Sequence, residues 1–283
     1  MDTMGLREFP PTLFEDIAKR LSDYTVGLVK LPGDENSVGA AVGGSGTLVR
    51  VDQRHAILTA AHVLDDFGTT QNIGLILATR FTPILHRYVL QSEAVNPVEV
   101  ACGRNGAEDP DLGLLLLSEA DVAALGALKS FYDLALHVDQ ALVSPRALDD
   151  GAWFMFGFAE EFTKDLPPER GFDQVKVFQG TPCLGYADGS FETAGFDYLD
   201  FVPVAGGSEL PHNCGGFSGA GLWEARLERR ADGALAAAAL ILSGAAFHQS
   251  ALVDGARTIR CHGRRSVYLH ALDQMRLTNR GEG

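Results

Sequence analysis

The chain has 283 residues, enough for two ordinary domains or one large all-β or α/β unit, and 46% of its residues are apolar. Its formal net charge of −14 argues against a nucleic-acid-binding protein, which would carry a basic stripe. The charge is uneven, because residues 251–283 contain six arginines and only three acidic residues. We interpret this basic end as a solvated surface, with a docking site for a partner as the alternative.

The N-terminal residues are acidic and polar, without the apolar core of a secretory signal. No apolar run approaches the ~20 residues that a membrane helix requires. The four cysteines lie far apart, without a C-x-x-C pair, at positions 102, 183, 214 and 261. The sequence therefore predicts a cytoplasmic protein with free thiols and no membrane association. One disulfide is the alternative if the chain is exported by another route.

The first half of the chain begins with a predicted amphipathic helix over residues 12–23, introduced by a capping box from Thr12 to Glu15. Short β-like runs follow at residues 26–29, 40–42, 47–51, 55–58, 74–78, 84–90, 98–101 and 112–117. Turn residues separate these runs at intervals of roughly 10 to 15 residues, which is typical of an all-β sandwich or barrel.

Residues 119–150 are richer in Ala and Leu, and we interpret them as a partly helical linker. Strand-like runs resume at 153–158, 175–178, 181–186, 198–204, 221–227 and 235–247, with a hairpin signal at Asp232-Gly233. A closing helix is predicted from Val267 to Met275. The predicted units are an N-terminal helical extension (1–24), a first β unit (25–118), the linker (119–150), a second β unit (151–265), and a C-terminal helix and tail (266–283).

One serine in the second β unit stands in a glycine-rich stretch, residues 213–223, immediately before a strand-like run. Glycines permit backbone conformations that a side chain would forbid. Ser218 is therefore a candidate nucleophile whose own loop supplies backbone N–H groups to an oxyanion. The alternative is an ordinary glycine-rich turn.

Two stretches of the first β unit carry candidate partners for this serine. His62 follows a strand-like run that ends in Thr-Ala-Ala-His, and Asp111 leads directly into a fully apolar strand. A lone histidine is usually structural, and a half-buried carboxylate usually needs a partner. The Gly-Ser-Gly-Thr segment at 44–47 is not a phosphate loop, because it lacks the Gly-Lys-Ser/Thr ending and a strand follows it.

Together the three stretches resemble the chymotrypsin/trypsin-like serine peptidase superfamily, in its bacterial, non-zymogen form. Residues 59–62 are similar to the Thr-Ala-Ala-His motif of the base, 111–114 to the motif of the orienting acid, and 216–219 to the Gly-x-Ser-Gly motif of the nucleophile. Their order along the chain is the order of that superfamily. The resemblance implies two six-stranded antiparallel β-barrels with a short N-terminal helix and a C-terminal helix.

The resemblance also implies a mechanism for a serine endopeptidase. Asp111 would orient His62, His62 would act as general base toward Ser218, and the N–H groups of Gly216 and Ser218 would hold the oxyanion. No metal or organic cofactor is expected. The expected partners are a protein or peptide substrate and one dedicated partner protein, with no nucleic acid and no membrane.

The sequence departs from the superfamily pattern around the serine. Phe217 replaces the Asp that precedes the serine in zymogen-activated members, so activation through that ion pair is not expected. His212, six residues before the serine, corresponds to the base of the family's specificity pocket, and residues 245–248 (Ala-Ala-Phe-His) correspond to its wall. The candidate substrate-binding residues are His212, Ala246, Phe247 and His248. Either histidine would favour an acidic P1 residue, and a small or apolar P1 residue is an equal alternative in which both are ordinary surface histidines. Cleavage after Arg or Lys is disfavoured, because it would require Asp at position 212.

Two other interpretations are open to the sequence. An α/β-hydrolase is disfavoured, because its G-x-S-x-G elbow would end in Ala220 here and no alternating strand–helix pattern precedes the serine. A catalytically inactive trypsin-like chain that serves as a protein-binding scaffold is the second interpretation. The complete set of His62, Asp111 and Ser218 argues against it.

Overall fold

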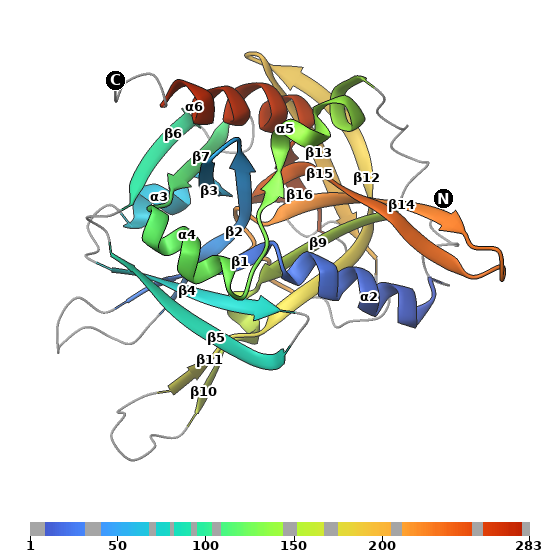
Figure 1. Cartoon of the computed structure of the whole chain (residues 1–283), viewed down its shortest axis with the longest axis horizontal. Helices are drawn as coiled ribbons and strands as arrows, with labels where there is room; N and C mark the ends of the chain where they lie inside the picture. The colour runs from blue at the N-terminus through green and yellow to red at the C-terminus, as the bar shows by residue number, and fades with distance from the viewer. Residues whose placement is uncertain are drawn as a thin grey trace.

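The computed structural model describes residues 9–31, 41–67, 72–79, 82–91, 95–103, 109–143, 152–166, 175–204, 211–250 and 257–278. Within these ranges the chain is mainly β, with helical segments near both ends (Figure 1). The strands form two large sheets and one separate two-stranded hairpin. The predicted mainly β class and the predicted terminal helices are confirmed.

The first sheet has eight strands, whereas the sequence predicted six. Seven of them are antiparallel in the order β5-β4-β1-β2-β3-β7-β6, and β8 pairs with β2 in parallel. Strands β5 and β6 stand at the two ends of this order, and no ladder of hydrogen bonds joins them within the described residues. The bounds are β1 (Thr25–Lys30), β2 (Ala41–Val51), β3 (Arg54–Thr59), β4 (Asn72–Thr79), β5 (Thr82–Gln91), β6 (Asn96–Cys102), β7 (Asp111–Leu116) and β8 (Tyr132–Asp133).

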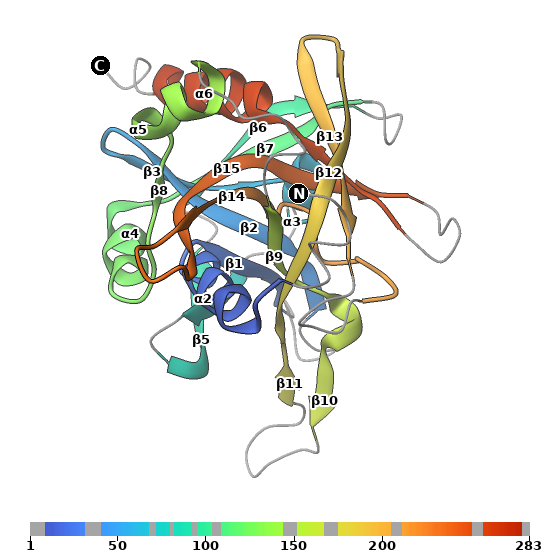
Figure 2. The same ribbon diagram turned by 90° about the vertical axis from the view of Figure 1, so that its right-hand side faces the viewer.

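The second sheet has six antiparallel strands whose pairing runs in a ring, β12-β13-β16-β15-β14-β9, with β9 paired back to β12. Its strands are β9 (Ala152–Phe158), β12 (Gly180–Thr193), β13 (Phe196–Pro203), β14 (Gly221–Arg229), β15 (Leu235–Gln249) and β16 (Ile259–His262). The hairpin predicted at Asp232-Gly233 joins β14 to β15. The separate hairpin of β10 (Lys164–Leu166) and β11 (Val175–Val177) projects away from both sheets (Figures 1 and 2).

The N-terminal helix, α2 (Pro11–Ser22), covers the core with its apolar face. Its buried apolar side chains include Leu13, Phe14, Ile17 and Leu21. The predicted capping box is wrong. The helix begins one residue earlier, with Pro11 in its first turn, and its N-cap, Pro10, makes no side-chain capping hydrogen bond. Thr12 consequently lies inside the helix.

Other helical segments lie in the linker, after β9 and at the C-terminal end. They are α4 (Glu119–Gly126), α5 (Leu134–Val138), the π-helix η2 (Asp139–Val143), the 3-10 helix η4 (Glu160–Phe162), the π-helix η5 (Ser266–Ala271) and α6 (Leu272–Leu277). In the described part of the chain, no helix combines the length and apolarity needed to span a membrane. All four cysteines are described and carry free thiols.

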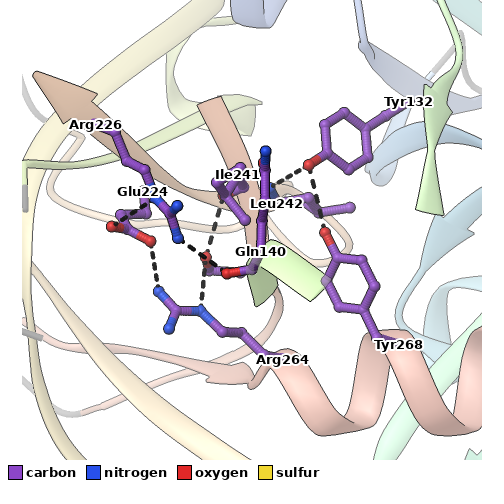
Figure 3. A network of polar contacts seen from close by, with 9 residues as sticks. Tyr132, Gln140, Glu224, Arg226, Ile241, Leu242, Arg264 and Tyr268 are labelled. Carbon is purple, nitrogen blue, oxygen red and sulfur yellow. Dashed lines mark hydrogen bonds and ion pairs between the residues drawn. The ribbon is translucent and has the colours of Figure 1, made fainter. Parts of the chain in front are cut away.

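A buried polar network ties the linker and the C-terminal helical segment to the second sheet (Figure 3). Glu224 is 1% exposed and accepts a hydrogen bond of 2.7 Å from Arg264, while Arg226 lies 3.4 Å from its other oxygen. Arg226 also donates to the carbonyl of Gln140 in η2 at 2.9 Å. A buried carboxylate needs such partners, because an unpaired charge in the interior is costly. Part of the basic C-terminal stretch is therefore internal: Arg264 is buried in this network.

Candidate active site

His62 lies in α3 (Ala61–Phe67), a short helix that the sequence analysis did not predict and that begins two residues after β3 ends. The apolar side chains of the helix are buried, which fixes it against the first sheet. They are Ala61, Val63, Leu64 and Phe67. The histidine side chain instead faces outward, with 46% of its surface exposed. The helix therefore presents one exposed imidazole on a buried support.

Asp111, the first residue of β7, holds His62 at two points. Its Oδ1 accepts the backbone N–H of His62 at 2.9 Å, and its Oδ2 pairs with Nδ1 of the ring. The aspartate side chain is only 15% exposed, so little water competes for its oxygens. A carboxylate that accepts the Nδ1 proton fixes the ring tautomer and leaves Nε2 with a free lone pair. This is the arrangement that a general base requires.

The electrostatics of the pair favour a protonated ring. The hydrogen bond to Asp111 raises the pKa of His62 above its ordinary value of 6.5, and the charges of Asp111, Asp66 and Asp65 add to this effect, while partial burial opposes it. A raised pKa makes the imidazole a stronger base toward a hydroxyl.

Ser218 lies in a tight loop whose backbone N–H groups divide into two sets. The N–H groups that donate hydrogen bonds within the protein are those of Cys214, Gly215, Phe217, Gly219 and Ala220. The N–H groups of Gly216 and Ser218 donate to no described residue. Two N–H groups without internal acceptors on one loop are suited to receive an oxyanion.

The loop conformation depends on a glycine at position 216. Gly216 has φ +90°, and a Cβ there would lie 2.3 Å from the carbonyl oxygen of Phe158. Its carbonyl accepts a hydrogen bond of 2.7 Å from the Ser45 hydroxyl. Only glycine adopts this backbone conformation freely and tolerates so close an approach.

Strand β2 connects the serine loop to the histidine helix. The Ser45 N–H donates to the Ser218 carbonyl at 2.7 Å. A Cβ built on Gly44 would lie 3.0 Å from the same carbonyl and 2.8 Å from a methyl carbon of Val63, the residue after His62. The backbone of Ser218, the predicted nucleophile, and the helix that carries His62, the predicted base, therefore both pack against Gly44 of β2. In the described part of the chain, no hydrogen bond joins the Ser218 hydroxyl to His62.

A pocket of about 190 Å³ opens beside Ser218. Its lining residues are Cys214, Gly215, Phe217, Ser218, Ala246, Phe247, His248, Gln249 and Ile259. Three predicted substrate-binding residues, Ala246, Phe247 and His248, line it, whereas His212 is exposed and does not. None of the lining side chains is acidic.

Sequence reasoning missed two residues of this region. Gln249 lines the pocket, and both polar atoms of its side-chain amide make hydrogen bonds. Its Oε1 accepts the Cys214 N–H at 2.8 Å, and its Nε2 donates to Oδ1 of Asn213 at 2.9 Å. His262 contacts Asp111 from the second sheet. Neither lies in a recognisable motif. Groups of three or more potential metal ligands are absent from the described ranges.

Comparisons with known proteins give no family for the chain. Neither a protein-family profile nor a curated protein sequence matches it. One solved chain, from a study of the coupled folding and binding of the intrinsically disordered VPg protein of Sesbania mosaic virus, matches 87% of this chain and 90% of its own length. The identity is 12% and the TM-score is 0.42. A similarity this distant carries no conclusion about fold or function.

Proposed function

We propose that the chain is a serine endopeptidase in which Ser218 is the nucleophile, His62 the general base and Asp111 the orienting acid. The observation that carries the proposal is the two-point contact between Asp111 and His62. An exposed histidine has no need of such a contact for folding, whereas a catalytic base needs a fixed tautomer and a fixed ring. In this proposal the two sheets correspond to the two β-barrels of the chymotrypsin-like fold, the first with two strands more than the expected six, one of them β8.

Acylation begins with attack of the Ser218 Oγ on the carbonyl carbon of the substrate peptide bond. The hydroxyl proton passes to Nε2 of His62, and the carbonyl oxygen becomes an oxyanion. The N–H groups of Gly216 and Ser218 receive that charge. Collapse of the intermediate breaks the C–N bond, and the leaving amine takes the proton from His62. The acyl group remains on Ser218.

Deacylation follows the same chemical steps with water as the nucleophile. His62 takes a proton from the water, whose oxygen bonds to the acyl carbon, and the same N–H groups hold the second oxyanion. The Ser218 oxygen then leaves and recovers the proton from His62. A peptide with a free carboxyl group is released, and the protein returns to its starting state.

The pocket beside Ser218 supports a neutral P1 residue. Its walls include the apolar side chains of Ala246, Phe247 and Ile259. A lysine or arginine side chain would enter without a carboxylate partner, and burial of an unpaired charge is expensive. Small or medium apolar P1 residues are therefore the proposed substrates, with an acidic P1 residue beside His248 as the competing outcome.

A fluorophosphonate probe tests the proposal, because it reacts covalently with activated serine hydroxyls. We expect labelling of the wild type at Ser218, located by peptide mass spectrometry, and none of Ser218→Ala or His62→Ala. Ser190→Ala removes an exposed serine remote from the loop and is the matched control, which we expect to label normally. A wild-type chain that resists the probe across pH would refute the enzyme proposal.

A second candidate function is a binding scaffold without activity. The Ser218 hydroxyl makes no hydrogen bond to His62 in this structure. Catalytic hydrogen bonds often tighten only in the substrate complex, so this geometry is compatible with either function. If the chain is a scaffold, Ser218→Ala should bind the same peptides with the same affinity as the wild type, and neither should cleave them.

A further inference from the structure

His262 meets the proposed triad from the opposite sheet. It is the last residue of β16, is 0% exposed, and its Nε2 accepts the backbone N–H of Asp111 at 2.9 Å. Asp111 begins β7 of the first sheet, so this hydrogen bond crosses between the two sheets. It ends on the backbone of the residue whose carboxylate holds His62.

The hydrogen bond defines the form of the ring. An Nε2 that accepts an N–H carries no proton, so a neutral His262 has its proton on Nδ1. Nδ1 has no hydrogen-bond partner in the described structure. The charges that act on the ring are those of Asp111 on β7, Asp197 on β13 and His270 on η5, and the titratable phenol of Tyr198 on β13 also contacts it. Burial outweighs the two aspartates and lowers the pKa of His262 to about 4.

Aromatic side chains fix the plane of the ring. Phe247 stacks on it with centroids 4.6 Å apart and an interplanar angle of 27°. Tyr198 and Phe196 contact it at 5.2 Å and 5.8 Å. Phe247 also lines the pocket beside Ser218, so one phenyl ring touches both the pocket and His262. A ring packed in this way has little freedom to tilt away from Asp111.

The backbone of His262 leads to the serine loop. His262 pairs with Ala245 of β15, and the next residue of that strand, Ala246, accepts the Gly219 N–H at 2.7 Å. Ala246 also donates its own N–H to the Ala220 carbonyl at 2.9 Å. One hydrogen-bonded path therefore runs from Asp111 through β16 and β15 to the two residues after Ser218.

We propose that His262 is a positioning residue that sets Asp111, and through it His62, in register with Ser218 across the two sheets. This inference rests on the proposed function. The ring acts as a neutral acceptor on the Asp111 backbone and touches no reacting atom. Loss of the acceptor leaves a partly buried N–H without this partner, and Asp111 moves to find another. The carboxylate then holds His62 less well.

Two substitutions of His262 test its hydrogen-bond acceptor and its aromatic packing separately. His262→Phe keeps an aromatic ring against Phe247 and removes the nitrogen, whereas His262→Gln supplies a neutral acceptor. His270→Phe is the matched control, because His270 stacks on Phe196 at 4.2 Å in the same aromatic cluster and does not touch Asp111. We expect His262→Phe to slow fluorophosphonate labelling by up to about a hundred-fold, with His262→Gln and His270→Phe near the wild type.

The titration of His62, followed by NMR, gives a readout that does not require activity. We expect the pKa of His62 to fall toward 6.5 in His262→Phe and to stay raised in the other two variants. An unchanged titration in His262→Phe would overturn the inference even if the wild type labels well. A wild type that does not label, together with the expected titration shifts, would refute the proposed function and leave the positioning role intact.

A measurement on the wild type covers the case in which His262→Phe does not fold. The imidazole ¹⁵N spectrum at about pH 6 should give His262 as a neutral ring with its proton on Nδ1. A proton on Nε2, or a charged ring at this pH, is incompatible with acceptance of the Asp111 N–H and would overturn the inference alone.

Discussion

The Ser45 hydroxyl joins the two sheets at the serine loop: it donates to the Gly216 carbonyl at 2.7 Å and accepts the Phe158 N–H at 3.0 Å. Ser45 lies in β2 and is 0% exposed, whereas both partners belong to the second half of the chain. One buried hydroxyl therefore satisfies two backbone groups and holds the loop against the first sheet.

Ser45→Ala should weaken both stability and the proposed activity. It leaves the Phe158 N–H and the Gly216 carbonyl without this partner, which costs about 1–3 kcal/mol of unfolding free energy. Labelling at Ser218 should slow, because the Gly216 peptide is no longer fixed. Ser22→Ala is the control: it removes a buried hydroxyl that donates to the Lys19 carbonyl at 2.7 Å, far along the chain from the loop. Equal labelling rates in the two variants would contradict the role of Ser45.

Adjacent glycines of the loop should respond differently to alanine. At Gly216 the methyl group would meet the Phe158 carbonyl at 2.3 Å and φ is +90°, so Gly216→Ala should fold with a displaced loop and lose most labelling. At Gly215 the nearest atom would lie 3.4 Å away, and Gly215→Ala should label within a few-fold of the wild type. Thermal unfolding and probe kinetics of both variants measure the contrast, and similar losses in both would contradict it.

Short segments of the sequence were sufficient to predict the elements whose structure depends mainly on neighbouring residues. Short apolar runs between turn residues located most strands, because a strand buried on both faces is apolar along its whole length, as β9 is. This pattern failed at β2, which was predicted as two runs, because Gly43–Gly46 interrupts the apolar pattern. The small residues there let other parts of the chain pack closely against β2. A Cβ on Gly44 would be too close to Val63 and to the Ser218 carbonyl. Tertiary contact decides those positions.

The rest of the site depends on contacts that no local window contains. Helix α3 is seven residues long, too short for a periodic pattern to separate it from the strand before it. His262 and Asp111 are 151 residues apart in the chain, and the strand that carries His262 has only four residues. The motifs of the base, acid and nucleophile could be recognised because their residues are contiguous. His262, which contacts Asp111 from the other sheet, lies in no such motif and could not be recognised from the sequence.

Cleavage preference gives a prediction for the pocket. In a panel of fluorogenic peptides that differ only at P1, Ala, Val and Leu should exceed Lys and Arg in kcat/KM by at least about ten-fold, because the described pocket offers a cation no carboxylate. A peptide with Glu at P1 is the informative competitor, since His248 lines the pocket. Preference for Lys or Arg would show that the pocket beside Ser218 is not the P1 site.

The pH dependence of labelling follows from the contact between Asp111 and His62. The hydrogen bond to Asp111 raises the pKa of His62, and His62 must be neutral to accept the Ser218 proton, so the rate should fall as the pH drops, with a midpoint above 6.5. Asp111→Asn should move the midpoint lower and reduce the plateau rate by about 10⁴. Asp66→Asn removes a charge on the same helix that raises the pKa of His62 less than Asp111 does, so it should shift the midpoint slightly while keeping the plateau.

The same shift gives a stability prediction of defined sign. Because the pKa of His62 is higher in the folded chain than the ordinary 6.5, the pair with Asp111 stabilises the fold fully below that value, and this contribution is lost as the pH rises through the folded pKa. The unfolding free energy lost in His62→Ala should therefore be larger below about pH 6.5 than above the folded pKa. Denaturant titrations of both proteins at several pH values measure the difference. A loss that grows with pH would mean that Asp111 does not hold the imidazolium, and the acid of the proposed triad would be wrong.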